Sequence, residues 1–533
     1  MKLTWSLLFT LPLVTCSILA PLSRSTAQIV PDVNLGGTEN SVVNPDAING
    51  IPSDRISGGA TRGSNLFHSF QDFNVGEGRG AYFANPDGIA NILTRVTGGN
   101  PSNILGKLGV LGNANLFLLN PKGIFFGANA SLDLSGSFFA STADSVLFDN
   151  FEFSASNPQP PPQLTVNIPI GLRFRDNPGS ISVQGTGNNL QFNPEFLEFT
   201  RNPTPPGLAV QPGKTLALVG GDINLEGGNL LADGGRIEVG SVDSSSFVSI
   251  TPINKGWQLG YTNVPAFRDI SLTKKASIDS SSEAGAGEIQ VQGRNIKLTD
   301  GSAIFAFTGS QPGGTVSVNA ADTLEVSGIS SDDSVPSTIY TAVYPRGSGT
   351  GSNLNIQAKR IIASGGAQIG ADTYGEGAAG NVVVKASDLV EIQGKVVIDE
   401  TLPPVPTAIG TIAQASSTGP GTKLTLETRR LKITDGGQLV TGTFSQSQAG
   451  TLDITASEST ELSGEGSAIS SVVGKDATGN GGTVILKTPN LIIRDQAKIN
   501  VDGQGSGNAG EVRVTSDTIR LENKGGITAQ ASS

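Results

Sequence analysis

The chain has 533 residues, of which 70 are glycine and only 15% are charged, which indicates a turn-rich β protein rather than a helical one. Its formal net charge is −11 and no basic stripe is present, so we expect no nucleic-acid partner. With one cysteine and one histidine the chain lacks the usual ligand set of a zinc site, and we expect no metal, no cofactor and no catalytic residue.

Residues 1–27 have the pattern of a secretory signal peptide. Lys2 precedes an apolar run over residues 3–19, and the segment ends in the small residues Ser25, Thr26 and Ala27. Cleavage after Ala27 would remove Cys16 and leave a cysteine-free chain that can cross a second membrane unfolded. The alternative is lipid modification of Cys16, which Thr15 fits poorly. No later segment has the roughly 20 apolar residues of a membrane helix, so we expect no transmembrane segment in the mature chain.

His68 lies in the strand-like segment 65–75, among three phenylalanines. A functional interpretation would make it a catalytic base or a metal ligand. The structural interpretation, a strand histidine beside aromatic rings, is the one that we favour, because no G-x-S-x-G turn is present to supply a nucleophile.

Two similar blocks follow, Asn85-Pro86-Asp87-Gly88-Ile89 and Asn120-Pro121-Lys122-Gly123-Ile124. Pro presets φ for a β-turn, the Asn side chain bonds the backbone ahead of it, Gly supplies positive φ, and Ile restarts a strand. We predict strands at 89–96, 104–110, 116–119 and 124–126. Because the last two are apolar on both faces, each should be either buried on both faces or covered by an added element.

The segment 65–143 resembles the N-terminal secretion domain of the filamentous haemagglutinin family, the exported partners of two-partner secretion systems, in its cyanobacterial form. The block at Asn120, Pro121, Lys122, Gly123 and Ile124 is similar to the family's Asn-Pro-Asn-Gly-Ile turn, with Lys122 replacing Asn. Asn85 and Pro86 stand where the family has an Asn-Pro-Asn-Leu turn. The runs TRVTGGNPSNILGKL and FGANASLDLSGSF also look like the family, and the resemblance covers roughly residues 30–260.

The resemblance implies a function. The chain would pass through the periplasm and engage a dedicated outer-membrane β-barrel transporter. It would then be secreted or displayed at the cell surface as an adhesin or haemagglutinin-like stalk, with host or cell-surface glycans or other cells as partners. The secretion-motif residues would be Asn85, Pro86, Asn120, Pro121, Lys122, Gly123 and Ile124.

Two proline clusters interrupt the β pattern, one at 158–162 and one at 203–206. Prolines this densely spaced cannot sit within a hydrogen-bonded ladder, so we interpret both clusters as loops thrown off a β stack.

From residue 276 onward an aliphatic residue opens a strand at intervals of 27 to 42 residues. These residues are Ile289, Val316, Leu354, Val382, Leu424, Leu452, Val484 and Val512. Stacking of equivalent residues, one coil apart, is typical of a solenoid. Because the intervals differ in length, we expect the longer ones to contain extra loops, at 330–337 and 400–407. We predict an all-β fold, a right-handed parallel β-helix (solenoid) with small β extra-elements in the N-terminal secretion domain.

The predicted organisation has four parts. They are a signal peptide at 1–27, a two-partner secretion (haemagglutination activity) domain at 28–156, a continued β-helix with Pro-rich excursions at 157–275, and a repeat β-helix at 276–533. The last coil carries no polar cap, and we expect the chain to be truncated at its C-terminus.

The alternative function is a secreted carbohydrate-active enzyme, a polysaccharide lyase or hydrolase. Such enzymes need carboxylates clustered on one outward face. Asp300, Asp435 and Asp495 follow strands here, but Asp300 and Asp435 precede glycine, a context that favours a turn. We therefore expect no enzyme.

Overall fold

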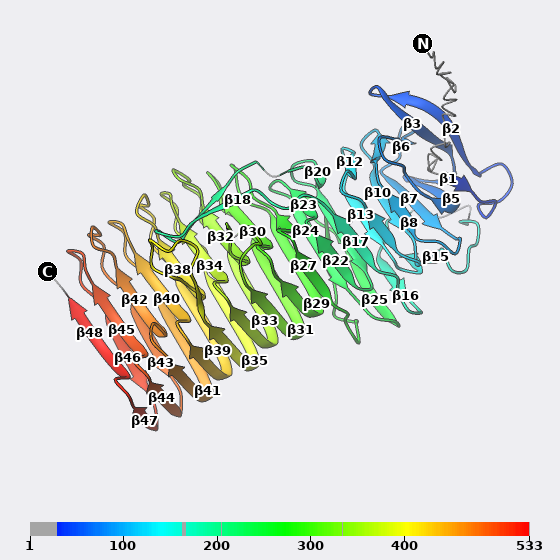
Figure 1. Cartoon of the computed structure of the whole chain (residues 1–533). Coiled ribbons are helices and arrows are strands. Elements are labelled where there is room, and N and C mark those ends of the chain that lie inside the picture. The colour runs from blue at the N-terminus through cyan, green and yellow to red at the C-terminus, as the bar shows by residue number, and fades with distance from the viewer. Residues whose placement is uncertain (1–28, 163–166, 204, 333, 532–533) are drawn as a thin grey trace, which may run out of the picture.

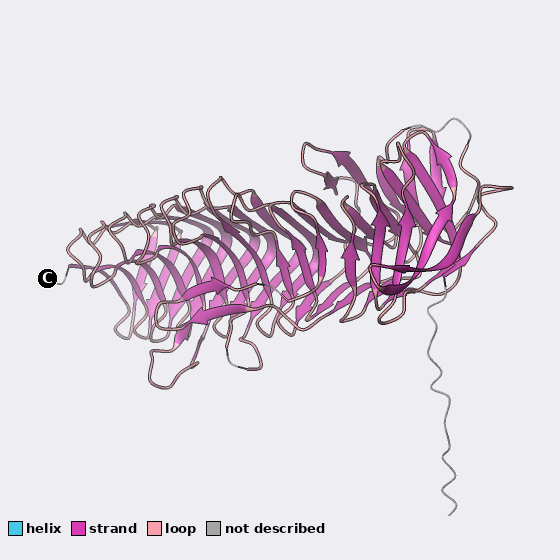
Figure 2. Ribbon diagram, turned by 90° about the horizontal axis from the view of Figure 1, so that it is seen from above, coloured by secondary structure: helices cyan, strands magenta, loops and turns pink. Residues whose placement is uncertain are grey.

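The computed structural model describes residues 29–531 except 163–166, 204 and 333; the predicted signal peptide and Cys16 therefore lie outside the described residues. Every helix or strand in the described part is a β-strand. The strands wind into one long solenoid with β1 at one end and β48 at the other (Figure 1). Figure 2 shows the strands of successive coils stacked side by side along the solenoid.

The solenoid has three strand-bearing faces, and each coil adds one strand segment to each face by parallel pairing. The first face contains β5 (Asn65–Phe73), β7 (Asn91–Val96), β10 (Asn115–Leu119), β13 (Phe138–Ser141), β21 (Thr215–Gly220) and β24 (Arg236–Ser241). The second contains β8 (Ser102–Ile104), β11 (Ile124–Phe126), β17 (Ile181–Gln184), β22 (Ile223–Glu226) and β27 (Ile270–Thr273).

From residue 288 a single long strand bends and serves both of these faces. These strands are β29 (Glu288–Leu298), β31 (Thr315–Ser327), β33 (Asn353–Ser364), β35 (Val382–Gln393), β39 (Lys423–Thr434) and β41 (Thr451–Ser463). The last two coils again use separate strands, β43 (Thr483–Lys487) with β44 (Asn490–Arg494) and β46 (Glu511–Thr515) with β47 (Thr518–Leu521).

The third face runs from β20 to the end of the chain. It contains β20 (Leu208–Val210), β23 (Asn229–Ala232), β28 (Ser277–Asp279), β30 (Ala303–Thr308), β32 (Thr338–Val343), β34 (Gln368–Thr373), β38 (Ala408–Ala413), β40 (Gln438–Thr443), β42 (Ala468–Val473), β45 (Lys498–Gly503) and β48 (Gly526–Ala531). A small hairpin, β36 (Lys395–Val396) with β37 (Val405–Pro406), lies in the loop before β38.

The N-terminal end is built differently. There the third face is formed by β6 (Gly80–Ala84), β9 (Lys107–Leu111) and β12 (Ser131–Asp133), and the hairpin β2 (Ser41–Ile48) and β3 (Ile51–Gly58) extends it. The short strands β1 (Ile29–Pro31) and β4 (Ala60–Arg62) pair antiparallel with β5. These pairings cover the end of the stack, which would otherwise expose unpaired strand edges.

The predicted repeat is confirmed as one aliphatic column along the first face. All eight aliphatic residues pair in register with their counterparts one coil away, and the column continues back through the N-terminal coils. Its earlier members are Leu66, Ile92, Leu116, Phe138, Leu216 and Ile237. The column lies in one hydrophobic core that extends from Ile29 to Val501.

The predicted covering element is an antiparallel sheet outside the first face. It consists of β14 (Ser145–Phe148), β15 (Phe151–Ser154), β16 (Gly171–Phe174), β25 (Ser246–Pro252) and β26 (Trp257–Gly260). Phe117 and Phe139 stack with ring centroids 4.3 Å apart, and Trp257 meets both edge-on. This second core explains why β10 is apolar on both faces; it does not include β11, whose Phe125 is half-buried.

Two predicted strands are wrong in their limits. The run 104–110 is not one strand, because Leu105 and Gly106 form a corner between β8 and β9. Gly106 passes so close to the carbonyls of Gly76 and Arg79 that a side chain would not fit. The strand expected to begin at Ile89 begins at Asn91 instead.

Another hairpin lies against the outside of the third face. β18 (Leu190–Asn193) and β19 (Glu198–Arg201) pair antiparallel between β17 and β20, and the second proline cluster follows them. Figure 1 shows β18 beside β30 and β32, and Leu190 and Phe199 pack in one cluster with Phe305, Phe307 and Tyr340 of the third face.

Candidate functional site

The second Asn-Pro block forms a β-turn between β10 and β11. The Gly123 N–H donates to the Asn120 carbonyl at 3.1 Å, with Pro121 and Lys122 at the two central positions. The Asn120 Oδ1 accepts from the Lys122 N–H at 3.0 Å, and Ile124 opens β11. This geometry is the one that the residue types predict.

Asn120 also ties neighbouring coils together. Its side chain is fully buried, and Nδ2 donates at 3.0 Å to both the Asn100 carbonyl and the Ser102 Oγ of the preceding coil. Its backbone N–H donates to the Ser141 carbonyl in the next coil. A buried amide with all these partners is costly to remove, because each partner would be left unpaired.

Gly123 is required by both backbone conformation and space. Its φ is +123°, a region that L side chains rarely adopt, and an added Cβ would lie 3.1 Å from the Ser180 carbonyl. Gly179, which precedes Ser180, passes closer still, since a Cβ there would lie 2.5 Å from the Gly123 nitrogen. The turn is therefore packed backbone against backbone.

The first Asn-Pro block differs in shape. Its β-turn closes between the Pro86 carbonyl and the Ile89 N–H at 3.2 Å, one residue later than in the second block. Asn85 Oδ1 accepts from the Ala114 N–H at 2.9 Å, so this turn also contacts the next coil. Asp87 and Gly88 are exposed, and a side chain at Gly88 would meet open space.

The structure does not bring the two turns together. The first lies at the corner between the third and first faces, and the second at the corner between the first and second faces. Asn85 and Asn120 share no hydrogen-bond partner in the described part of the chain. Lys122 is exposed, whereas Asn120, Gly123 and Ile124 are buried.

Two buried arginines beside the turns were missed by the sequence analysis. Arg95 is fully buried on β7; it donates to the carbonyls of Asn34, Ser154 and Gln159, and its guanidinium lies 4.4 Å from the Phe153 ring centroid. Burial lowers the pKa of Arg95 to about 10.

Arg62 is also buried and pairs with Glu39 at 2.7 Å, which raises the pKa of Arg62 above its ordinary value. Arg62 donates to the carbonyls of Pro161 and Pro162. The first proline cluster is thus held against the N-terminal coils. For Arg95, the available sequence signal was a single charged residue within the otherwise uncharged run of β7.

His68 is a buried strand histidine beside aromatic rings, as the sequence analysis favoured. Burial lowers its pKa to about 3, so the ring is neutral. Nδ1 lies 3.0 Å from the Ser41 Oγ, Nε2 is buried without a hydrogen-bond partner in the described residues, and the ring lies beside Phe70 and Phe83. A side chain without solvent access is badly placed to transfer protons to a substrate.

The three aspartates weighed for an enzyme adopt turn conformations. Asp300, Asp435 and Asp495 each have φ of +56°, and their carboxylates accept bonds from Ser331, Gln393 and Asn523 respectively. Over residues 29–531, with the gaps given above, no group of three or more His, Cys, Asp or Glu could hold a metal ion. In the same residues no helix is long and apolar enough to span a membrane.

Comparison with known proteins adds three findings. Residues 27–291 match the family model of the TPS secretion domain. The heme/hemopexin-binding protein of Haemophilus influenzae is 36% identical over 75 residues, which are 14% of this chain and 8% of that protein. The chain thus aligns with a small part of the length of this curated relative.

Among solved structures, the HMW1 secretion domain from Haemophilus influenzae is similar at 16% sequence identity and a TM-score of 0.35. The alignment covers 92% of this chain and 98% of that chain. Both Asn-Pro turns, the N-terminal strands and the covering sheet lie inside the span that matches the family model.

Proposed function

Residues 27–291 of this chain are a TPS secretion domain, the segment that directs export in two-partner secretion, and on that premise we propose roles for the turns and for the solenoid behind them. The chain is an exported protein of such a system, and its domain implies an outer-membrane transporter as partner. The match to the family model is the observation that carries the proposal.

The two Asn-Pro turns hold the first coils in the shape that the transporter engages. Asn120 links three successive levels of the stack, and the close backbone contact at Gly123 and Gly179 leaves no room for a different turn. We assign these residues a shaping role rather than direct contact, because Asn120 and Gly123 are buried. Residues 1–27 would act as a cleaved signal peptide that delivers the chain to the periplasm.

The solenoid would then act at the cell surface as a stalk that attaches the cell to glycans or to other cells. Support comes from its form, since a long repeated flank offers many equivalent contacts along one body. Folding of coil on coil outside the cell would oppose backsliding during export.

Export can be tested with the full chain in a bacterium with two membranes, with and without a co-expressed outer-membrane barrel transporter of the two-partner type. We expect Asn120→Ala to lower the amount of chain outside the cell at least about fivefold, since it leaves several buried groups unpaired. Lys122→Ala is the matched control in the same turn, because we assign the shaping role to the buried residues of the motif and not to Lys122. Because Lys122 is exposed, this variant should be exported within about twofold of wild type.

The result is read by immunoblotting of medium and cell surface. Chain outside the cell in the absence of the barrel would contradict the proposal for the whole protein. Equal export of Asn120→Ala and wild type would contradict the role of the turn alone.

A further inference from the structure

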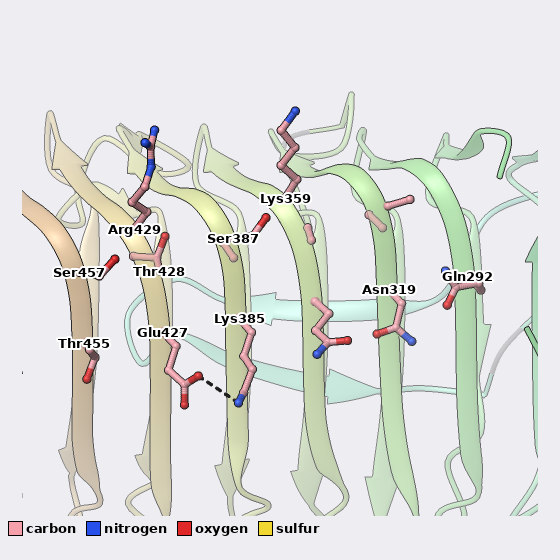
Figure 3. Close-up of a pocket in the computed structure, with 15 residues that line it drawn as sticks. Gln292, Asn319, Lys359, Lys385, Ser387, Glu427, Thr428, Arg429, Thr455 and Ser457 are labelled. Atoms are coloured by element: carbon pink, nitrogen blue, oxygen red, sulfur yellow. Dashed lines mark ion pairs between the residues drawn. The ribbon is translucent and has the colours of Figure 1, made fainter. Parts of the chain in front are cut away.

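A groove runs along the outside of the solenoid where the long strands bend from the first face to the second (Figure 3). Its volume is about 1000 Å³, and it crosses six coils from β29 to β41. Each strand contributes one polar side chain at the same register, and these are Gln292, Asn319, Gln357, Lys385, Glu427 and Thr455. The pairing places them in one row, with a spacing of about 4.8 Å per coil.

The amides of this row are free to bind a ligand. The side chains of Gln292, Asn319 and Gln357 make no hydrogen bond to any residue that the structure describes, and all three are at least partly exposed. Each offers a carbonyl acceptor and two N–H donors.

A second row of amides, at Asn65, Asn91 and Asn115, shows how such side chains are arranged when they bind each other instead of a ligand. Asn115 Nδ2 donates to Asn91 Oδ1 at 2.9 Å, and Asn91 Nδ2 donates to Asn65 Oδ1 at 3.0 Å, one coil after another. Asn65 and Asn91 are buried, and this ladder uses its amides to hold coils together. The groove row has the same one-coil spacing but leaves its amides open to solvent.

The charges of the groove are balanced. Lys385 pairs with Glu427 at 3.0 Å, as Figure 3 shows, Arg429 on the far wall pairs with Asp388 at 2.8 Å and Glu458 at 3.3 Å, and Lys359 lies 4.0 Å from Asp322. Cations already paired with carboxylates do not form the basic track that a nucleic acid or a strongly acidic polymer needs. A groove whose cations are already paired in this way is best suited to an uncharged ligand.

The repeat distance argues against a peptide. An extended peptide laid along the groove would present side chains to one face about every 6.7 Å, out of step with a row at about 4.8 Å per coil. The strands cross the groove with their backbone groups paired within the sheet, so no free edge is offered for β-augmentation. A polymer with hydroxyl groups on every unit can instead match successive amides.

We propose that this groove binds an extended, largely uncharged polysaccharide, which the amides of Gln292, Asn319 and Gln357 hold through its hydroxyl groups. The floor is formed by the small residues Ala320, Ala358 and Ala386, which let the chain lie close to the backbone. The proposal deepens the surface-attachment function and rests on it for its biological role. Since hydrogen bonds to single sugars are weak, affinity accumulates along the polymer.

Binding is tested with purified chain spanning residues 28–533 by affinity electrophoresis in gels containing dextran, galactomannan or xylan. Heparin, polygalacturonate and a mixed-sequence single-stranded oligonucleotide serve as anionic probes. We expect retardation by at least one uncharged polysaccharide at physiological salt. The double variant Asn319→Ala/Gln357→Ala should weaken that retardation at least about fivefold, with an unchanged thermal midpoint.

The matched control is Gln446→Ala/Gln448→Ala, which removes two exposed amides from the loop between β40 and β41. It should bind as wild type. Retardation by none of the uncharged polymers, retardation by anionic probes alone, or equal binding of the groove variant and wild type would each overturn the proposal.

A cell-attachment assay separates this proposal from the function on which it rests. If the groove variant is exported and attaches cells as wild type does, the groove assignment fails and the attachment function stands. If wild-type chain is exported without attaching cells but still binds a polysaccharide in a groove-dependent manner, the attachment function fails and the groove assignment stands.

Discussion

Buried hydroxyl groups distinguish otherwise similar positions inside the solenoid. Thr460 stands in a column of the second face between Leu431 and Leu491, fully buried, and its Oγ1 has no hydrogen-bond partner in the described residues. Thr411 is equally buried on the third face, but its Oγ1 lies 3.3 Å from that of Thr441. The same side chain thus has opposite energetic consequences at the two sites.

Thr460→Val should stabilise the surrounding coils by about 1–2 kcal/mol, because it keeps the shape and removes an unpaired buried hydroxyl. Thr411→Val should destabilise them by about 1–3 kcal/mol, because it leaves Thr441 unpaired. Hydrogen exchange of β39 to β44 and of β38 to β40 measures the two effects. Equal shifts in the same direction would contradict this account.

At the scale of elements, the hairpin β18–β19 lies over a buried polar cluster on the third face. The Phe199 N–H donates to the Tyr374 hydroxyl at 3.0 Å, and the hydroxyls of Tyr374 and Tyr340 lie 2.9 Å apart. The Tyr340 hydroxyl donates to Asp372 at 2.7 Å. Burial raises the pKa of Asp372 to about 6, and desolvation raises the pKa of Glu198 on the hairpin itself.

The docking of this hairpin should depend on pH. A carboxyl whose pKa is raised in the folded state favours that state at low pH, and this contribution is lost as the pH rises through about 6. Hydrogen exchange of residues 188–203 should therefore show several-fold weaker protection at pH 7.5 than at pH 5, after correction for the intrinsic exchange rate.

Asp372→Asn is the control, since it cannot ionise and should remove most of the difference. A pH effect of the same size in this variant would assign the response to another group. Peptides from β5 report separately on His68. Because burial lowers the pKa of His68, its effect on stability is opposite to that of Asp372, and stability is lost as the pH falls below about 6.5.

The elements also show which features the sequence could predict. The second Asn-Pro turn was predictable because the bonds that close it are local, from the Asn120 side chain to the Lys122 N–H and from the Gly123 N–H to the Asn120 carbonyl, whereas its bonds to neighbouring coils were not predictable. The first turn has a similar sequence, but its closing hydrogen bond lies one residue later, since the Asn85 side chain accepts from the Ala114 N–H of the next coil instead. The position of the hairpin was not predictable, because its partners lie far along the chain.

At the scale of the whole molecule, one aliphatic column joins the secretion domain to the repeat region. Ile289 of the matched span pairs with Val316 beyond it, and the column then passes through every later coil. Its periodicity was visible in the sequence because each residue repeats the same role in each coil. Arg95 and Arg62 were missed because each acts once, through contacts with distant backbone carbonyls.

A solenoid should transmit damage only to neighbouring coils. Leu354→Ala removes a fully buried side chain from the middle of the column and should cost about 2–5 kcal/mol locally. We expect faster hydrogen exchange in β31, β33 and β35, whereas β5 to β10 should exchange at wild-type rates. Uniform loss of protection along the chain would show instead that the solenoid unfolds as one cooperative unit.

The hairpin over the third face has a consequence for the order of folding. Neighbouring coils join residues a few tens of positions apart, whereas the Phe199–Tyr374 bond spans 175 positions. This high-contact-order link, like the Arg201–Tyr344 bond over 143 positions, cannot form until the coils that carry these tyrosines and Tyr340 are in place. Until then Phe192 and Phe199 lack their apolar cover. The hairpin therefore docks after these coils have folded, and this step locks the secretion domain to the stalk.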